Sequence, residues 1–206
     1  SSAVFISYIL PKKYKNMVKP VIELLAGIPS VIYGLFGMKI LGPFIKDVFD
    51  LPIGLTALTA SIMLGIMALP TVMSLSEDAI SSVPKKFRDA SLALGSTKWE
   101  TIRKVILPTS SSGIVTAVIL GMGRAIGETM TVLMVAGGAA VIPESILKPV
   151  RPMTATIAAE MGEAPVGSEH YQALFGIAII LFIITLSFNI LADIFSKRFK
   201  RKVSGQ

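Results

Sequence analysis

The sequence predicts an all-α fold, a polytopic bundle of transmembrane helices. Hydrophobic residues make up 52% of the 206 residues, and the mean hydropathy of +0.71 exceeds what a soluble domain with polar loops carries. Several apolar stretches reach the roughly 20 residues that a helix needs to cross a bilayer. The net charge of +7 is concentrated in short basic segments between these stretches. That distribution excludes the continuous basic surface of a nucleic-acid-binding protein.

Four stretches are long enough to cross the membrane, and several of them carry prolines or glycines that free backbone groups, among them Pro29, Pro70 and the run "GMGRAIG". A soluble helical bundle is the alternative, but four apolar runs of this length would leave it almost no amphipathic surface. The opening stretch, residues 2–10, is too short to cross and is interpreted as the end of a truncated helix, so the chain is expected to be a fragment. The predicted spans are residues 21–45, 53–75, 113–136 and 171–195.

The connections between these spans alternate between rich and poor in lysine and arginine. Residues 12–19, 77–111 and 197–206 hold four, six and five of them, whereas residues 46–52 and 139–168 hold one and two. By the positive-inside rule, the rich connections lie in the cytoplasm. The sequence therefore predicts a cytoplasmic loop over residues 77–111, an extracytoplasmic loop over residues 139–168, and a cytoplasmic C-terminus, all within a single transmembrane domain covering residues 1–206.

The predicted cytoplasmic loop contains two short helices that meet at a glycine. Pro84 suits the first turn of the first helix, and Gly95 suits its end. Thr97 and Glu100 have the spacing of a capping box at the start of the second helix, which Pro108 is expected to end. This basic pair of helices can dock to a partner protein, or it can contact lipid headgroups.

Two opposite charges fall within the third predicted span. Arg124 and Glu128 are four residues apart, so on a continuous helix they share a face. A central arginine costs roughly 2.5–3.5 kcal/mol on translocon scales, so we expect Arg124 to face the interior of the bundle. A structural ion pair is one interpretation. The other is that Arg124 offers its hydrogen-bond donors to a passing oxyanion while Glu128 orients it.

The sequence contains no recognisable enzyme site. It has no cysteine, which excludes disulfides and thiolate chemistry, and no Walker-type phosphate-binding loop. Glu160, Glu163, Glu169 and His170 are interpreted as part of the solvated loop 139–168 rather than as a metal site. Two roles are compatible with this loop. It can contact a substrate-delivering protein, or part of it can re-enter the membrane. The chain is predicted to have no catalytic residue and to bind no metal or nucleotide.

The segment "DASLALGSTKWETIRKVILP" resembles the signature loop of ABC importer permeases, E-A-A-x3-G-x9-I-x-L-P. Four residues match this form, and three replace its Glu, second Ala and Ile. The matching residues are Ala90, Gly95, Leu107 and Pro108, and the replacements are Asp89, Ser91 and Val105. The resemblance implies a type I, MetI-like permease fold. It also implies that this loop is the coupling helix, which enters a cleft of a separate ATPase subunit.

Three further segments are similar to phosphate-importer permeases of the PstC type: "ELLAGIPSVIYGLFG", "GRAIGETMTVLMVAGG" and "TATIAAEMGEA". The likeness covers about residues 11–195. It implies a multi-pass subunit of a prokaryotic inner membrane, embedded in lipid, that conducts phosphate by alternating access, and it favours the substrate role of Arg124.

The same resemblance implies three partner proteins. They are a nucleotide-binding ATPase that carries ATP and Mg²⁺, a second, PstA-like permease, and an extracytoplasmic phosphate-binding protein. The alternative functions are transport of another oxyanion, such as sulfate or molybdate, and a membrane signalling or scaffold subunit. A buried Arg124 argues against a scaffold, which has no use for a costly charge within the membrane.

Overall fold

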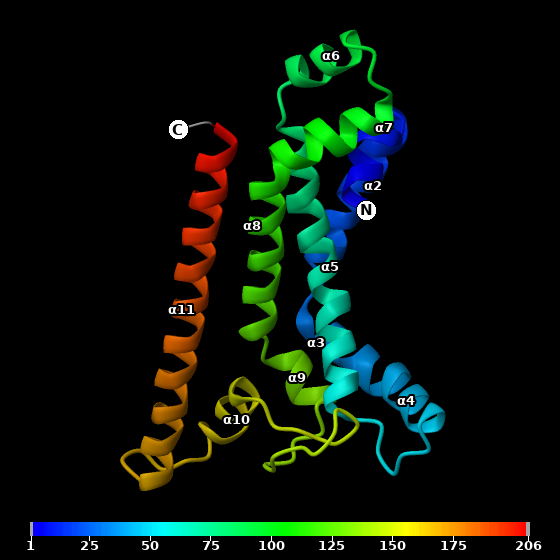
Figure 1. Cartoon of the computed structure of the whole chain (residues 1–206). Helices are drawn as coiled ribbons and strands as arrows, with labels where there is room; N and C mark the ends of the chain where they lie inside the picture. The colour runs from blue at the N-terminus through cyan, green and yellow to red at the C-terminus, as the bar shows by residue number, and fades with distance from the viewer. Residues whose placement is uncertain (1, 205–206) are drawn as a thin grey trace. The chain divides into compact units, whose positions relative to one another are not determined.

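The computed structural model describes residues 2–204, and for residues 9, 12, 192 and 195–204 it describes the backbone alone. Helices make up nearly all of the regular structure in this part of the chain, where the β pairing is limited to one isolated bridge between Gly137 and Val150 (Figure 1). The predicted all-α class is confirmed.

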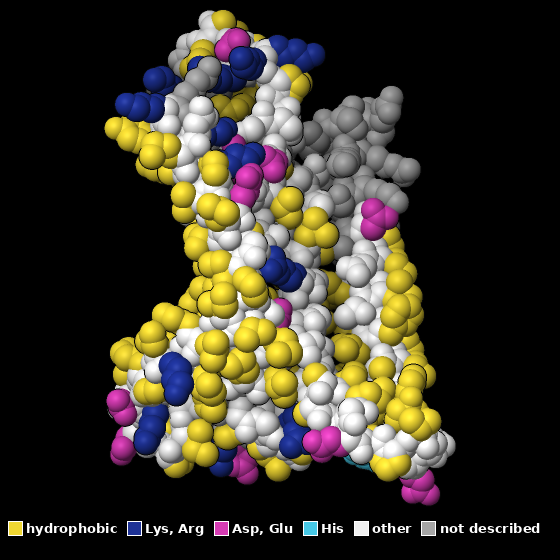
Figure 2. Space-filling model, turned by 180° about the vertical axis from the view of Figure 1, so that it is seen from behind, with side chains coloured by type: hydrophobic (Ala, Val, Ile, Leu, Met, Phe, Trp, Pro, Cys, Tyr) yellow, Lys and Arg dark blue, Asp and Glu magenta, His cyan; other side chains and the backbone are white. Residues whose placement is uncertain are grey.

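Three helical runs within the described residues are long and apolar enough to cross a membrane. They are α5 (Ala57–Ser81), the run Lys98–Ile126, and Glu169–Leu191 at the start of α11 (Glu169–Ser204). A fourth candidate is a bent pair of runs, Lys13–Ala26 and Ser30–Val48, which meet at 84°. Figure 2 shows hydrophobic side chains over much of the visible surface, which suits contact with lipid or with other membrane subunits.

The first predicted span, residues 21–45, is a broken helix, interrupted at the proline within it. α2 (Lys12–Ala26) and α3 (Ser30–Phe36) are separated by three residues that end in Pro29. Pro29 has φ −56° and ψ 136°, and its ring disfavours helical backbone at the residue before it. After this break the helical run continues through η2 (Gly37–Leu41) and α4 (Gly42–Val48).

The third predicted span, residues 113–136, is also interrupted. α8 (Leu107–Ile126) ends before Gly127, and the short helix α9 (Met130–Val135) begins three residues after that glycine. Glycine has a low helix propensity, and the polar side chains that follow it compete for backbone hydrogen bonds, so the sequence "GET" can end a helix inside an apolar stretch. Hydropathy alone does not reveal such a break.

Pro108 lies inside a helix rather than at its end, so that prediction is wrong. α8 is continuous with α7 (Lys98–Thr101) and with the π-helical turn η3 (Ile102–Ile106). The Leu107 N–H donates to the Ile102 carbonyl oxygen across this wider turn. Because the π turn shifts the hydrogen-bond spacing, the helix accommodates a proline that has no N–H to donate.

The chain forms two compact units, each assembled from separated segments. Unit 1 consists of Ser1–Ala26, Leu69–Met122 and Phe188–Gln206, and unit 2 consists of Gly27–Ala68 and Gly123–Ser187. The core of unit 1 joins the opening helix α1 (Ser2–Val4) to the end of α5 and to η3. Its buried hydrophobic residues are Ala3, Ile80, Val83 and Ile106.

The core of unit 2 lies where α3 and η2 contact α9. Met63 and Val135 are completely buried there. Gly37 permits the close approach, because a Cβ at this position would lie 2.7 Å from Val135 Cγ1 and 2.8 Å from Met63 Cγ. The same core includes Ala155 from α10 (Met153–Glu160).

Gly54 packs directly against the backbone of Gly42. A Cβ at Gly54 would lie 1.8 Å from the Gly42 carbonyl oxygen and 2.5 Å from its carbonyl carbon, so no side-chain movement can relieve the clash. Since overpacking costs about 1–3 kcal/mol or more, we expect Gly54→Ala to lower the melting temperature of the purified subunit by at least about 3 °C or to prevent its folding. Gly65→Ala is the control, because a Cβ there meets nothing within 4 Å. Equal melting temperatures for the two variants would contradict this packing.

Candidate functional site

The predicted coupling loop forms an elbow in unit 1, built from α6 (Lys85–Ala93) and α7 (Figure 1). Pro84 precedes the first residue of α6, as expected. Gly95 follows the helix with φ +85°, and its N–H donates to the Leu92 carbonyl oxygen at 3.0 Å. Side chains disfavour this left-handed conformation, so the glycine sets the bend between the two helices.

Two sets of side-chain hydrogen bonds fix the elbow. The Glu100 N–H donates to Thr97 Oγ1 at 3.2 Å, and the Thr97 N–H donates to Glu100 Oε2 at 3.0 Å, which confirms the predicted capping box. Ser91 Oγ and Thr101 Oγ1 are buried and lie 3.0 Å apart, in hydrogen-bond contact between α6 and α7. Ser91, one of the departures from the signature pattern, therefore gives the elbow an internal link that alanine could not provide.

The remaining signature residues lie on the outside of the elbow or at the start of α8. Asp89 and Ala90 are exposed on α6, while Leu107 is half-buried and Pro108 exposed in α8. Three large apolar side chains are also exposed on the elbow, Phe87 at 44%, Leu94 at 88% and Trp99 at 62%. The elbow thus presents an apolar surface that nothing in unit 1 covers.

Sequence reasoning missed a buried carboxylate, Glu77, that joins separate segments of unit 1. Its side chain is 3% exposed and forms ion pairs with Lys15 Nζ at 2.6 Å and Lys19 Nζ at 3.0 Å, both from α2. Ser81 Oγ donates to Glu77 Oε1 at 2.5 Å, and Ser7 Oγ does so at 3.4 Å from η1 (Phe5–Ile9). Glu77 therefore ties the amphipathic helix α2 to the end of α5, one turn before the elbow.

Glu77→Gln removes the buried carboxylate that Lys15 and Lys19 share, while the lysine side chains stay 26% and 33% exposed and Lys19 keeps its ion pair with Asp78. Hydrogen bonds to a charged group contribute about 1.5–3 kcal/mol each, so we expect Glu77→Gln to lower the melting temperature of the purified complex by about 3 °C or more. Lys104→Gln is the control, because the Lys104–Glu100 pair is exposed at 72% and 44% and contributes at most about 1 kcal/mol. Thermal-shift measurements compare the melting temperatures of the two variants. An equal decrease in both would contradict a structural role for Glu77.

The intramembrane charges lie at the break that follows α8, in unit 2. Arg124 is half-buried in the last turn of α8, and Glu128 is half-buried within the break itself. The two residues therefore do not share the face of one continuous helix, and that part of the prediction is wrong. The reason is local: the helix has already ended at Ile126.

Glu128 lies where the starts of three helices meet. Its Oε1 accepts a hydrogen bond from the Thr131 N–H of α9 at 3.2 Å, and its carbonyl oxygen accepts one from Thr154 Oγ1 of α10 at 2.8 Å. Thr131 is completely buried, and its Oγ1 donates to the carbonyl oxygen of Ser30, the first residue of α3, at 3.0 Å. The Thr131–Ser30 hydrogen bond therefore connects the start of α9 to the start of α3. The two hydrogen bonds of Glu128 fix the backbone of the break before α9.

The predicted extracytoplasmic loop contains α10 and a charged cluster that its spacing did not reveal. Arg151 Nε donates to the Gly138 carbonyl oxygen at 2.7 Å, and Arg151 forms an ion pair with Glu160. His170 Nε2 lies 3.2 Å from Glu160 Oε2. No group of three or more acidic or histidine side chains is placed to hold a metal ion in the part of the chain that the structure describes.

The fold and this arrangement of spans, breaks and elbow define a class of membrane transport subunit. Residues 3–205 match the family described as binding-protein-dependent transport system inner membrane component, and the chain belongs to it. It is therefore a multi-pass inner-membrane permease component of the ABC transporter class.

The relatives narrow this class. The chain is 41% identical over 200 residues to the probable ABC transporter permease protein YqgH of Bacillus subtilis, covering 97% of this chain and 65% of that protein. It is 36% identical over 202 residues to the phosphate transport system permease protein PstC of Mesorhizobium japonicum, covering 89% and 62%. The predicted resemblance to PstC-type permeases is confirmed, and the chain spans less than two thirds of the length of these relatives.

A solved structure supports the fold independently. The chain matches a chain of the MetNI methionine ABC transporter in an inward-facing conformation with a TM-score of 0.71 and 19% identity, covering 96% of this chain and 84% of that one. The predicted MetI-like permease fold is confirmed.

Proposed function

We propose that the chain is the permease subunit of an ATP-driven phosphate importer and that the anion passes Arg124. The observation that carries the proposal is a half-buried guanidinium in the last turn of a spanning helix, next to a break. Broken helices inside membranes are tolerated where they line a cavity or a binding site. The similarity to permeases named for phosphate transport supports phosphate as the cargo.

Arg124 has the chemistry that a phosphate pathway requires. Its planar guanidinium can give two parallel hydrogen bonds to an oxyanion and stays charged at every physiological pH. A cation within the membrane is unfavourable, and binding an anion offsets part of that cost during transport. Arg124 is the substrate-binding residue of this proposal.

Glu128 acts on the pathway without binding the anion. A free carboxylate beside the route would repel phosphate, whereas Glu128 Oε1 already accepts the Thr131 N–H. We assign it the role of holding the break open and keeping Arg124 oriented beside it.

The elbow transmits work from another subunit. In this proposal α6, with Asp89, Ala90 and Ser91, enters a cleft of a nucleotide-binding ATPase. The elbow then acts as a lever that transmits the motion of the ATPase, and Gly95 is its bend. Leu107 and Pro108 connect the elbow to α8, whose last turn carries Arg124. ATP and Mg²⁺ are held by the ATPase, and this chain needs no cofactor.

The remaining partners follow from the same assembly. A PstA-like permease completes the pathway in the lipid bilayer, and an extracytoplasmic binding protein delivers phosphate to the side of residues 139–168. The elbow and the C-terminus lie in the cytoplasm, as the distribution of lysine and arginine requires. The side chains of the basic residues after 196 lie outside the described part of the chain.

Reconstitution tests the proposal. The full-length permease, its partner permease and the ATPase are placed in liposomes, the binding protein is added outside, and ATP is enclosed. We expect radioactive phosphate to accumulate only with ATP, and sulfate and molybdate in equal excess to leave its uptake unchanged. Accumulation of sulfate or molybdate instead would change the cargo. ATP hydrolysis with no accumulation of any oxyanion would identify a scaffold and refute transport.

A further inference from the structure

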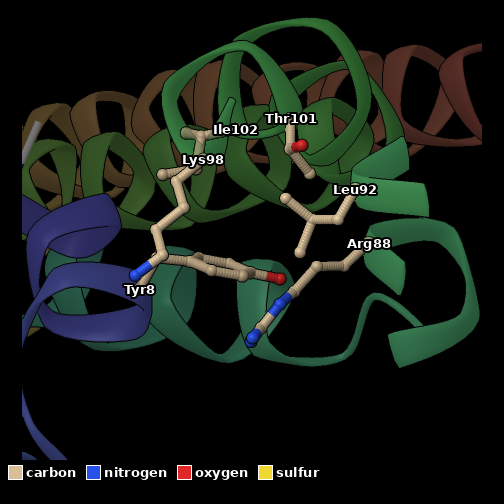
Figure 3. Close-up of a pocket in the computed structure, with 6 residues that line it drawn as sticks. All are labelled: Tyr8, Arg88, Leu92, Lys98, Thr101 and Ile102. Carbon is tan, nitrogen blue, oxygen red and sulfur yellow. The ribbon is translucent and has the colours of Figure 1, made fainter. Parts of the chain in front are cut away.

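A pocket of about 90 Å³ lies on the inner side of the elbow in unit 1 (Figure 3). It is bounded by η1 and by the two arms of the elbow, α6 and the run from α7 into η3, which are distant from η1 in sequence. Figure 3 shows the guanidinium of Arg88 directed toward the hydroxyl of Tyr8, while the nitrogen of Lys98 lies at the other end of the tyrosine ring. The lining residues are Tyr8, Arg88, Leu92, Lys98, Thr101 and Ile102.

The charge of this pocket is positive and uncompensated. No lining residue is acidic, and neither Arg88 nor Lys98 forms an ion pair with any residue that the structure describes. The acidic residue closest in sequence to Lys98 is Glu100, which is engaged by the Thr97 N–H and by Lys104 at 3.4 Å. The pocket therefore combines two cations and hydroxyl groups with apolar walls.

The pocket and the exposed apolar surface of α6 are on different faces of that helix. Arg88 and Leu92 are one turn apart and line the pocket. Phe87 and Leu94 are two turns apart and share another face, about 100° away, where both are exposed. A protein partner that covers Phe87 and Leu94 consequently leaves the pocket to a smaller ligand.

We propose that this pocket binds a phosphate group, either as the headgroup of an acidic phospholipid or as inorganic phosphate. The Arg88 guanidinium and the Tyr8 hydroxyl, which lie together, provide donors for a tetrahedral oxyanion, and the Lys98 ammonium adds positive charge from the other end of the tyrosine ring. Leu92 and Ile102 supply apolar walls that suit the glycerol and the first methylenes of a lipid. The inference concerns a second anion site and holds whichever cargo the permease carries.

A bound phosphate group would cross-link the elbow. Tyr8 belongs to η1, Arg88 to α6 and Lys98 to α7, so one ligand contacts all three segments. Occupancy is therefore expected to stiffen the elbow through which the ATPase acts, and to raise the amount of substrate transported per ATP hydrolysed.

Binding is measured on the full-length permease in complex with its partner subunits. In the first arm, native mass spectrometry counts adducts of phosphatidylglycerol and of phosphatidylcholine. In the second, the complex is held in phosphatidylcholine nanodiscs and binding of inorganic phosphate is titrated. The test protein carries Arg88→Gln and Lys98→Gln together. The matched control carries Lys85→Gln and Lys104→Gln, which remove the same charge from α6 and η3 outside the pocket.

We expect the test pair to weaken binding at this pocket by about 100-fold relative to the control, because each charge-assisted hydrogen bond that is lost lowers the affinity by about tenfold or more. A loss confined to phosphatidylglycerol identifies a lipid site, and a loss in the second arm identifies free phosphate as a ligand. Equal binding by the test and control proteins in both arms overturns the proposal, as does occupation of the pocket by an acidic side chain of the ATPase. Arg88→Gln alone, at an exposed residue, serves if the double variant does not assemble.

Discussion

Replacing Arg124 with glutamine is expected to abolish ATP-driven phosphate uptake. The substitution removes the charge and the paired donors while keeping a polar side chain of similar length. Two charge-assisted hydrogen bonds contribute about 1.5–3 kcal/mol each, so uptake by proteoliposomes should fall by about 100-fold or more. Arg124→Lys keeps the charge without the planar fork and should retain an intermediate rate.

The loss must arise from transport and not from assembly. Co-purification with the ATPase should be unchanged in Arg124→Gln, because glutamine is easier to insert into a membrane than arginine. Lys46→Gln is the matched control, since it removes the same charge from an exposed residue at the end of α4. Unchanged uptake by Arg124→Gln would refute the substrate role of Arg124.

Replacing Gly95 with proline is expected to uncouple ATP hydrolysis from transport. Proline fixes φ near −65°, whereas Gly95 has φ +85°, and it removes the N–H that donates to the Leu92 carbonyl oxygen. The end of α6 must therefore re-form, and the helix leaves its position relative to α7. We expect ATPase activity to persist in the complex while the phosphate transported per ATP falls several-fold.

Gly95→Asn is the matched control, because asparagine enters the left-handed region more readily than other residues with side chains. A Cβ at Gly95 meets nothing within 4 Å, so any effect there is conformational and not steric. Ala90→Glu tests the same lever through its exposed surface, with Ala90→Ser as its control. If coupled uptake survives both Gly95→Pro and Ala90→Glu, the elbow is not the lever.

The elbow was predictable in detail because it depends on local chemistry. Pro84, Gly95 and the Thr97–Glu100 pair act on the backbone within a few residues of themselves, and each has the predicted role. The apolar runs predicted the membrane helices for a similar reason, since a helix that crosses the bilayer needs about 20 predominantly apolar residues.

The two helix breaks and the Glu77 network were not predictable in the same way. Hydropathy averages over a window, so it passes through Pro29 and Gly127 without registering that the helix ends there. Glu77 pairs with lysines from a separate helix far away in the sequence, and its own neighbours give no sign that it is buried. Pro108 was misassigned because a preceding π turn removes the usual penalty for proline.

Site-directed labelling beside Arg124 tests the anion pathway most directly. The chain has no native cysteine, so Gly127→Cys creates a unique thiol in the break, where a Cβ has only ordinary contacts, the nearest 3.8 Å from the Gly123 carbonyl oxygen. In the reconstituted complex we expect a small anionic thiol reagent to modify this chain and phosphate to slow the reaction, with an equal concentration of chloride having no effect. A thiol that the reagent never reaches, or one whose labelling is indifferent to phosphate, would contradict a pathway past Arg124.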